Sequence, residues 1–271
     1  MFEVMQPQKT DNIHLKVRDA NSALFSMHTD GENALPDTAQ LQQQVITLQN
    51  LVNTTQEKIR QLVPKSFLLS LPRQQLSGDF CWAEKSGDKT YIGVGDCTGQ
   101  SIRAAHNAII ACHLLTAALE NLPGKHPAEI LDEVNAEFYS LFNNENGCGE
   151  QSFIRMALIA FNPHHPELEY AASLNPIYLT RQNTLEKLPA DRFPVGPRFG
   201  GSQRAFTPQH IQLNHGDTVY LFSDGYAAQT GGRHNKKFNA TRFRQLLLSI
   251  QDHPMPAQKR LLDEELKAWM G

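Results

Sequence analysis

Three aspartates have the residue type and the setting that a metal site requires. Asp79 and Asp96 each follow a glycine, and Asp224 precedes one, at the ends of predicted strands. Carboxylate oxygens are the ligands that hard divalent cations such as Mg²⁺ and Mn²⁺ prefer. Strand ends hold such side chains in fixed positions. The sequence therefore predicts that Asp79, Asp96 and Asp224 converge on a divalent-metal site.

The segment between the first two aspartates predicts a hairpin that sets them face to face. Gly87-Asp88 is a two-residue loop with glycine in the first position, which favours a type II′ turn. Counting back equally from both sides of this loop places Asp79 opposite Asp96. Two carboxylates in facing positions, with Cβ atoms about 4.5–5.5 Å apart, destabilise a sheet unless a cation compensates them. The competing interpretation is that Gly-Asp is ordinary turn chemistry.

Composition narrows the class of protein. The 271 residues are 40% hydrophobic and 20% charged with a net charge of −3, which favours a globular protein without a nucleic-acid partner. The four cysteines form no C-x-x-C pair, so we expect reduced thiols and a cytoplasmic protein. The most apolar run, Ala108–Leu119, has about 12 residues and is too short to cross a bilayer. No membrane partner is expected.

The N-terminal region predicts an arm and a helix. Residues 1–37 lack a hydrophobic period and predict a flexible arm. Residues 38–63 predict an amphipathic or coiled-coil linker helix that ends at Pro64. The positions of one heptad seam are apolar except for a single polar residue, Thr55. They are Leu41, Val45, Leu48, Val52, Thr55, Ile59 and Leu62. Two interpretations stay open, a helix packed on its own domain and a homodimer through Leu41–Leu62.

The remaining chain predicts an α+β domain with largely antiparallel sheets, because hairpins replace βαβ alternation. The predicted strands are Ser66–Leu71, Phe80–Lys85, Thr90–Gly95, Phe153–Phe161, Leu168–Ser173, Ile177–Arg181 and Val219–Ser223. The predicted helices are Ser101–Leu119, Pro127–Phe142, Ala240–Ile250 and Pro256–Trp269.

These motifs together resemble a known family. The chain carries, in this order, Ser77-Gly78-Asp79-Phe80, Gly95-Asp96-Cys97-Thr98-Gly99, Asn175-Pro176, Pro194-Val195-Gly196 and a segment from Gly216 to Gly225. They are similar to the PPM-type metal-dependent serine/threonine phosphatases of the SpoIIE and RsbU branch. The resemblance implies an αββα sandwich over residues 64–271, in which two mainly antiparallel sheets are flanked by helices.

The same resemblance implies a chemistry. It implies two Mn²⁺ or Mg²⁺ ions held by Asp79, Asp96, Asp224 and the backbone carbonyl of Cys97, with the three aspartates acting through metal-bound water. The substrate so implied is phosphoserine or phosphothreonine on a signalling partner protein, such as an anti-sigma-factor antagonist.

The chain departs from the family pattern at three places. Gln100-Ser101 stand where a His-Gly pair is usual, and Arg155 stands where an acidic segment is usual. The sequence also reaches Gly271 without the acidic strand that closes the family domain. These departures favour a second hypothesis, a catalytically weak or silent phosphatase-like domain that binds a regulatory partner.

A third hypothesis rests on a cysteine. Cys97 and Arg103 have the C-x₅-R spacing of cysteine phosphatases, in which a thiolate lies against a phosphate-binding loop. The glycine placement around Cys97 does not fit that loop, so this pattern has little weight.

Overall fold

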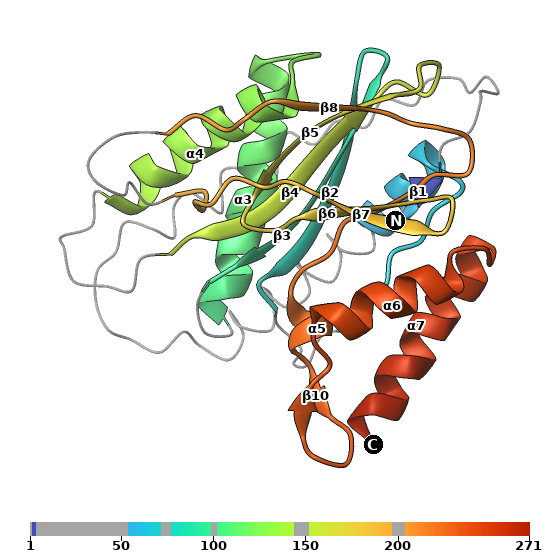
Figure 1. The fold of residues 1–271 in the computed structure, drawn as a ribbon. Coiled ribbons are helices and arrows are strands. Elements are labelled where there is room, and N and C mark those ends of the chain that lie inside the picture. Colours follow the sequence, from blue (N-terminus) through green and yellow to red (C-terminus); the bar gives the residue numbers. More distant parts are fainter. Residues whose placement is uncertain (1, 4–53, 72–76, 99–101, 144–151, 197–203) are drawn as a thin grey trace.

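The computed structural model describes residues 2–3, 54–71, 77–98, 102–143, 152–196 and 204–271 (Figure 1). The predicted arm lies outside the described residues except for Phe2–Glu3. The first part of the predicted linker helix, up to residue 53, also lies outside them.

The first sheet carries the predicted hairpin. Its strand order is β2-β3-β4-β5-β8, and all of its neighbours are antiparallel. The strands are β2 (Asp79–Ser86), β3 (Lys89–Cys97), β4 (Ile154–Phe161), β5 (Glu167–Ser173) and β8 (Gln209–Gln212). Six of the seven predicted strands thus have a counterpart, four in this sheet and two, Ile177–Arg181 and Val219–Ser223, in the next one.

The second sheet has the order β1-β9-β6-β7 and is also antiparallel. Its strands are β1 (Phe2–Glu3), β9 (Thr218–Tyr220), β6 (Ile177–Arg181) and β7 (Thr184–Leu188). A small hairpin of β10 (Thr230–Gly231) and β11 (Lys236–Lys237) stands apart from both sheets.

Helices cover the outer face of each sheet, as Figure 1 shows. The helices α3 (Ile102–Asn121) and α4 (Pro127–Asn143) pack on the first sheet, whereas α5 (Gly225–Ala228), α6 (Ala240–Ile250) and α7 (Met255–Met270) lie with the second. A third group of buried residues, including Ile92, Ile159 and Leu179, fills the space between the sheets. The predicted αββα sandwich is confirmed.

Two predicted strands differ from the structure. Ser66–Leu71 forms no strand; Phe67 and Leu69 instead pack against the aromatic cluster beneath α6 and α7. Val219–Ser223 is shorter than predicted, because β9 ends at Tyr220 and Phe222 turns to stack on Tyr178, with ring centroids 4.6 Å apart. Phe67, Leu69 and Phe222 thus serve packing rather than a strand ladder.

The linker helix lies on the domain where the structure describes it. Residues 54–62 are helical, and Thr55, Ile59 and Val63 are buried. Ile59 and Val63 belong to the cluster between the sheets, and Lys58 forms an ion pair with Glu84 of β2. The last part of the heptad pattern is therefore used within the domain. Among the described helices, none has the length and apolarity that a membrane span requires.

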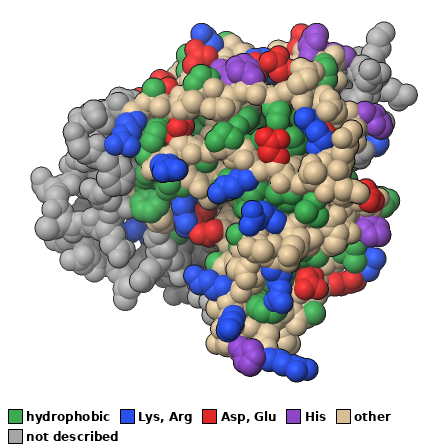
Figure 2. All heavy atoms as spheres, in the orientation of Figure 1, with side chains coloured by type: hydrophobic (Ala, Val, Ile, Leu, Met, Phe, Trp, Pro, Cys, Tyr) green, Lys and Arg blue, Asp and Glu red, His purple; other side chains and the backbone are tan. Residues whose placement is uncertain are grey.

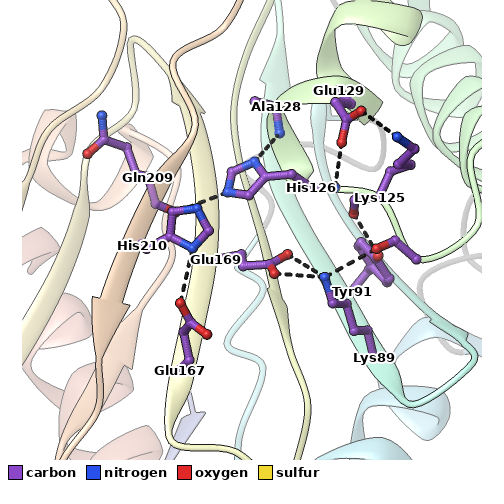
Figure 3. Close-up of polar contacts among 11 residues, drawn as sticks. Lys89, Tyr91, Lys125, His126, Ala128, Glu129, Glu167, Glu169, Gln209 and His210 are labelled. Atoms are coloured by element: carbon purple, nitrogen blue, oxygen red, sulfur yellow. Dashed lines mark hydrogen bonds and ion pairs between the residues drawn. The ribbon is translucent and has the colours of Figure 1, made fainter.

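A histidine fastens α4 to the edge strand β8 (Figure 3). The His126 Nδ1 atom accepts a hydrogen bond of 3.0 Å from the Ala128 N–H, in the first turn of α4. The Nε2 atom donates to the Gln209 carbonyl of β8 at 3.1 Å. The bond from the Ala128 N–H requires the neutral ring, because an imidazolium has no acceptor nitrogen.

Burial lowers the pKa of His126 below its ordinary value. The neighbouring His210 and Lys89 act in the same direction, whereas the Gln209 carbonyl and Glu169 oppose it. Lys89 is itself paired with Glu169 at 2.7 Å. Burial and the bond that Nδ1 accepts thus both favour the neutral form of the His126 ring.

This histidine predicts a pH dependence of stability. As the pH falls through about 6.5, the unfolded chain takes up a proton at this position before the folded chain does, so the free energy of unfolding should decrease. Urea unfolding across that range should show a shallower decrease for His126→Gln than for the wild type. The exposed His164 provides the control, since His164→Gln should follow the wild type. Parallel curves for His126→Gln and the wild type would contradict the assignment.

Candidate metal centre

Asp79 and Asp96 face each other as predicted. They are directly paired at the open end of the β2–β3 hairpin, whose turn has Gly87 at φ +59°. The Ser77 hydroxyl lies 3.1 Å from Asp79 Oδ2, to which it donates, and 3.1 Å from the Asp79 N–H. The two-residue turn therefore fixes the register, and Ser77 orients the outer carboxylate.

Gly78 brings two further oxygens to the same place. The Cys97 N–H donates to the Gly78 carbonyl at 3.0 Å. A Cβ atom on Gly78 would lie 2.4 Å from the Cys97 carbonyl oxygen and 3.3 Å from Asp96 Oδ1. Both oxygens therefore border one small space that only glycine leaves open.

Arg155 is the third member of a row across the sheet. It lies on β4 directly opposite Asp96, which lies opposite Asp79. Its guanidinium donates from Nη2 to Asp96 Oδ2 at 2.7 Å and from Nη1 to Asp224 Oδ2 at 2.6 Å. Its Nε atom is buried and has no hydrogen-bond partner among the described residues. Arg155 thus links two of the three predicted ligands.

The charges of this row shift the pKa values of its members. Burial raises the pKa of Asp96, and the facing Asp79 raises it further, while Arg155 opposes both. Burial acts to lower the pKa of Arg155, but Asp224 and Asp96 outweigh it and raise that pKa. Positive charge next to Asp96 therefore favours its ionised form.

The start of β4 is fixed from both sides, which fixes the position of Arg155. On one side, Thr98 bonds to Phe153 through its N–H (2.9 Å) and through its hydroxyl, which accepts from the Phe153 N–H (3.0 Å). On the other side, Ile154 and Val195 exchange two backbone bonds of 2.9 and 3.0 Å.

The Pro194-Val195-Gly196 and Asn175-Pro176 motifs find their role here. The Gly196 N–H donates to Asn135 Oδ1 of α4 at 2.7 Å, which holds the segment that pairs with β4. The Asn175 side chain donates to the Arg155 carbonyl at 3.4 Å. Both motifs therefore support the strand that presents Arg155.

Asp224 lies in the segment that connects β9 of the second sheet to α5. It is the N-cap residue of the short helix α5, yet its side chain makes no capping bond and reaches Arg155 instead. Its side chain is 54% exposed, against 19% for Asp96. The Tyr226 hydroxyl donates to the Leu262 carbonyl at 2.8 Å and so ties α5 to α7.

The arrangement differs from a convergence of all three aspartates on one ion. Among the described residues, no three Asp, Glu, His or Cys side chains gather closely enough to hold a metal ion. Asp79, Asp96 and the Cys97 carbonyl are hard oxygen donors at one end of the hairpin, and they fit a divalent cation. Asp224 is held through the Arg155 guanidinium, a built-in cation.

Sequence reasoning missed the bridging role of Arg155. Its only signal was a positive charge where the family pattern is acidic. The pairing of Asp96 with Arg155 had no short loop from which to count, because α3 and α4 separate β3 from β4.

The cysteine hypothesis does not fit the structure. Cys97 is buried, and burial raises the pKa of its thiol well above the ordinary value. Arg103 is exposed on α3. A buried neutral thiol is no nucleophile.

Basic side chains gather on part of the surface. Figure 2 shows Lys and Arg over the lower part of the face that carries α6 and the β10–β11 hairpin in Figure 1. Exposed members of this region are Arg233, Lys236, Lys237 and Arg242. They belong to the segment that follows α5, in the β10–β11 hairpin and the start of α6.

Gly78 gives a direct stability prediction. Gly78→Ala should lower the free energy of unfolding by about 1–3 kcal/mol, because the new methyl group meets the Cys97 carbonyl. Gly93→Ala on the same hairpin is the matched control, since its Cβ would meet flexible side chains at 3.5 Å or more. Urea denaturation of both variants measures the difference. Equal losses would show that the close approach at Gly78 is not critical.

Comparisons with known proteins agree with this fold. The sequence model of the family Stage II sporulation protein E (SpoIIE) matches residues 86–271, which include Asp96 and Asp224. The phosphoserine phosphatase RsbU of Bacillus subtilis (strain 168) is 27% identical over 162 residues, covering 58% of this chain and 44% of that protein. The chain thus spans less than half the length of this curated relative.

Two solved structures share the architecture. The SiaA-PP2C domain of Pseudomonas aeruginosa superposes with a TM-score of 0.75 at 23% identity, covering 86% of this chain and 90% of that one. The PP2C phosphatase domain of SpoIIE from Bacillus subtilis, with a fragment of its regulatory domain, gives 0.57 at 17% identity, covering 72% and 54%. These structures support the fold, and the family match covers more than half of the sequence. The chain therefore belongs to the SpoIIE family of PPM-type phosphatase domains.

Proposed function

We propose that this chain is a metal-dependent protein phosphatase that hydrolyses phosphoserine or phosphothreonine on a signalling partner. The observation that carries the proposal is the pairing of Asp79 with Asp96 beside the Cys97 carbonyl. These oxygen donors suit Mg²⁺ or Mn²⁺, and membership of the SpoIIE family supports phosphate-ester hydrolysis as the reaction class.

The proposed ligands are Asp79, Asp96 and the Cys97 carbonyl, with Asp224 facing them across Arg155. A bound divalent cation supplies Lewis-acid stabilisation of phosphoryl charge and a lowered pKa for water. The two carboxylates offset the charge of that cation, and Ser77 holds the outer one in place. In the reaction, water forms a bond to phosphorus, the bond from phosphorus to the seryl or threonyl oxygen breaks, and that oxygen gains a proton.

The partner is proposed from chemistry and from resemblance. A relative from Bacillus subtilis is named as a phosphoserine phosphatase, and the motifs resemble a branch that acts on anti-sigma-factor antagonists. The basic surface over α6 and the β10–β11 hairpin would attract an anionic, phosphorylated protein.

Asp96→Asn tests the activity. Turnover of a phosphoserine protein in Mn²⁺ should fall by more than about 100-fold, since even changes behind the ligands of a metal cost about 10–100-fold. The control is Asp88→Asn, the same change in the exposed turn of the same hairpin. A chelator should abolish the wild-type rate.

Equal rates for the wild type and Asp96→Asn would contradict the proposal. That result would favour the second hypothesis, a silent domain that binds a regulatory partner.

We also propose self-association through the part of the heptad pattern that precedes the described helix. Thr55 and Ile59 pack on the domain, and the proposed contact uses Leu41, Val45, Leu48 and Val52, which lie outside the described residues. Light scattering should show a dimer for the wild type and a monomer for Leu48→Asp, because a buried carboxylate breaks an apolar seam. A dimer that persists in Leu48→Asp would exclude this contact.

A further inference from the structure

We propose that Arg155 replaces one of two cations, so that the centre binds a single divalent ion beside Asp79 and Asp96 while the guanidinium neutralises Asp224. This inference deepens the proposed function and rests on it for the kind of ligand. It concerns Arg155, which lies on β4 directly opposite Asp96.

The charges of the cluster favour one divalent ion. Three carboxylates and one guanidinium leave two negative charges uncompensated. One divalent cation balances them, whereas two would leave a positive excess in a partly buried site. Without Arg155 the three carboxylates would lack this compensation and would attract a second ion.

Asp96 divides its two oxygens between two cations. Its Oδ2 accepts from Arg155 at 2.7 Å. Its Oδ1 borders the space beside Gly78 that the Cys97 carbonyl also borders. Oδ2 therefore bonds to the guanidinium, and Oδ1 lies on the same side as the Cys97 carbonyl, where the metal ion is proposed to bind.

Asp224 is committed in the same way. Its Oδ2 accepts from Arg155 at 2.6 Å, and no side-chain cap bond competes for it. An ion that used the two Oδ2 atoms would have to displace Arg155 and would be repelled by its charge.

Arg155 belongs to the framework rather than to a mobile surface. The bonds of Phe153 to Thr98, of Ile154 to Val195 and of Asn175 to the Arg155 carbonyl fix its backbone. Its side chain is 30% exposed, and its Nε atom is buried. A residue fixed in this way serves as a permanent counter-ion.

Counting Mn²⁺ on the full chain tests the inference. Protein stripped with a chelator is dialysed against Mn²⁺, and bound Mn²⁺ is measured by electron paramagnetic resonance and elemental analysis. We expect one tightly bound Mn²⁺ per wild-type chain and two per Arg155→Gln chain. The glutamine keeps hydrogen-bonding capacity but loses the charge.

Arg181→Gln is the matched control. Arg181 is likewise paired with an aspartate, Asp217, at 2.6 Å, but in the second sheet. This variant should keep one Mn²⁺ per chain.

Two results would overturn the inference. One is a wild type that binds two Mn²⁺ or none. This measurement uses the wild type alone and does not depend on whether Arg155→Gln folds. The other is a folded Arg155→Gln protein, verified by circular dichroism, that still binds one.

The count is independent of turnover. A wild type with one Mn²⁺ and no phosphatase activity would contradict the proposed function alone, and an active wild type with two would contradict this inference alone.

Discussion

The centre depends on the balance of charge along one row of cross-strand neighbours, Asp79, Asp96 and Arg155. The facing carboxylates of Asp79 and Asp96 repel each other, and because Asp79 is exposed, solvent screens part of that repulsion. The folded chain offsets the remainder with the Arg155 guanidinium on the next strand, which donates to Asp96.

The two bonds of Arg155 differ in strength and therefore in role. Asp96 is mostly buried, whereas Asp224 is 54% exposed. Exposed ion pairs contribute about 0.2–1 kcal/mol. The Arg155–Asp96 pair is thus the more shielded of the two, and the Arg155–Asp224 pair is the more exposed. Asp96 lies on β3 of the first sheet, whereas Asp224 lies in the segment that follows β9 of the second.

The length of the connection between two strands decided whether their register could be predicted from the sequence. A two-residue turn fixed the register of β2 and β3, so the facing of Asp79 and Asp96 could be counted. The β3–β4 register depends on how two helices pack across the sheet, and no local rule gives it. The helix α6 was predicted to the residue, as its cap explains: Asn239 accepts hydrogen bonds from the N–H groups of Thr241 and Arg242. The short strands β7 and β8 were not predicted, because they carry exposed side chains and lack a clear apolar pattern.

The most direct measurement of the central claim is a crystal structure of the full chain grown in Mn²⁺, with anomalous diffraction recorded at the manganese edge. The account predicts one anomalous peak, beside Asp79, Asp96 and the Cys97 carbonyl, with Arg155 still bonded to Asp96 and Asp224. Two peaks, with the guanidinium displaced from Asp224, would contradict it.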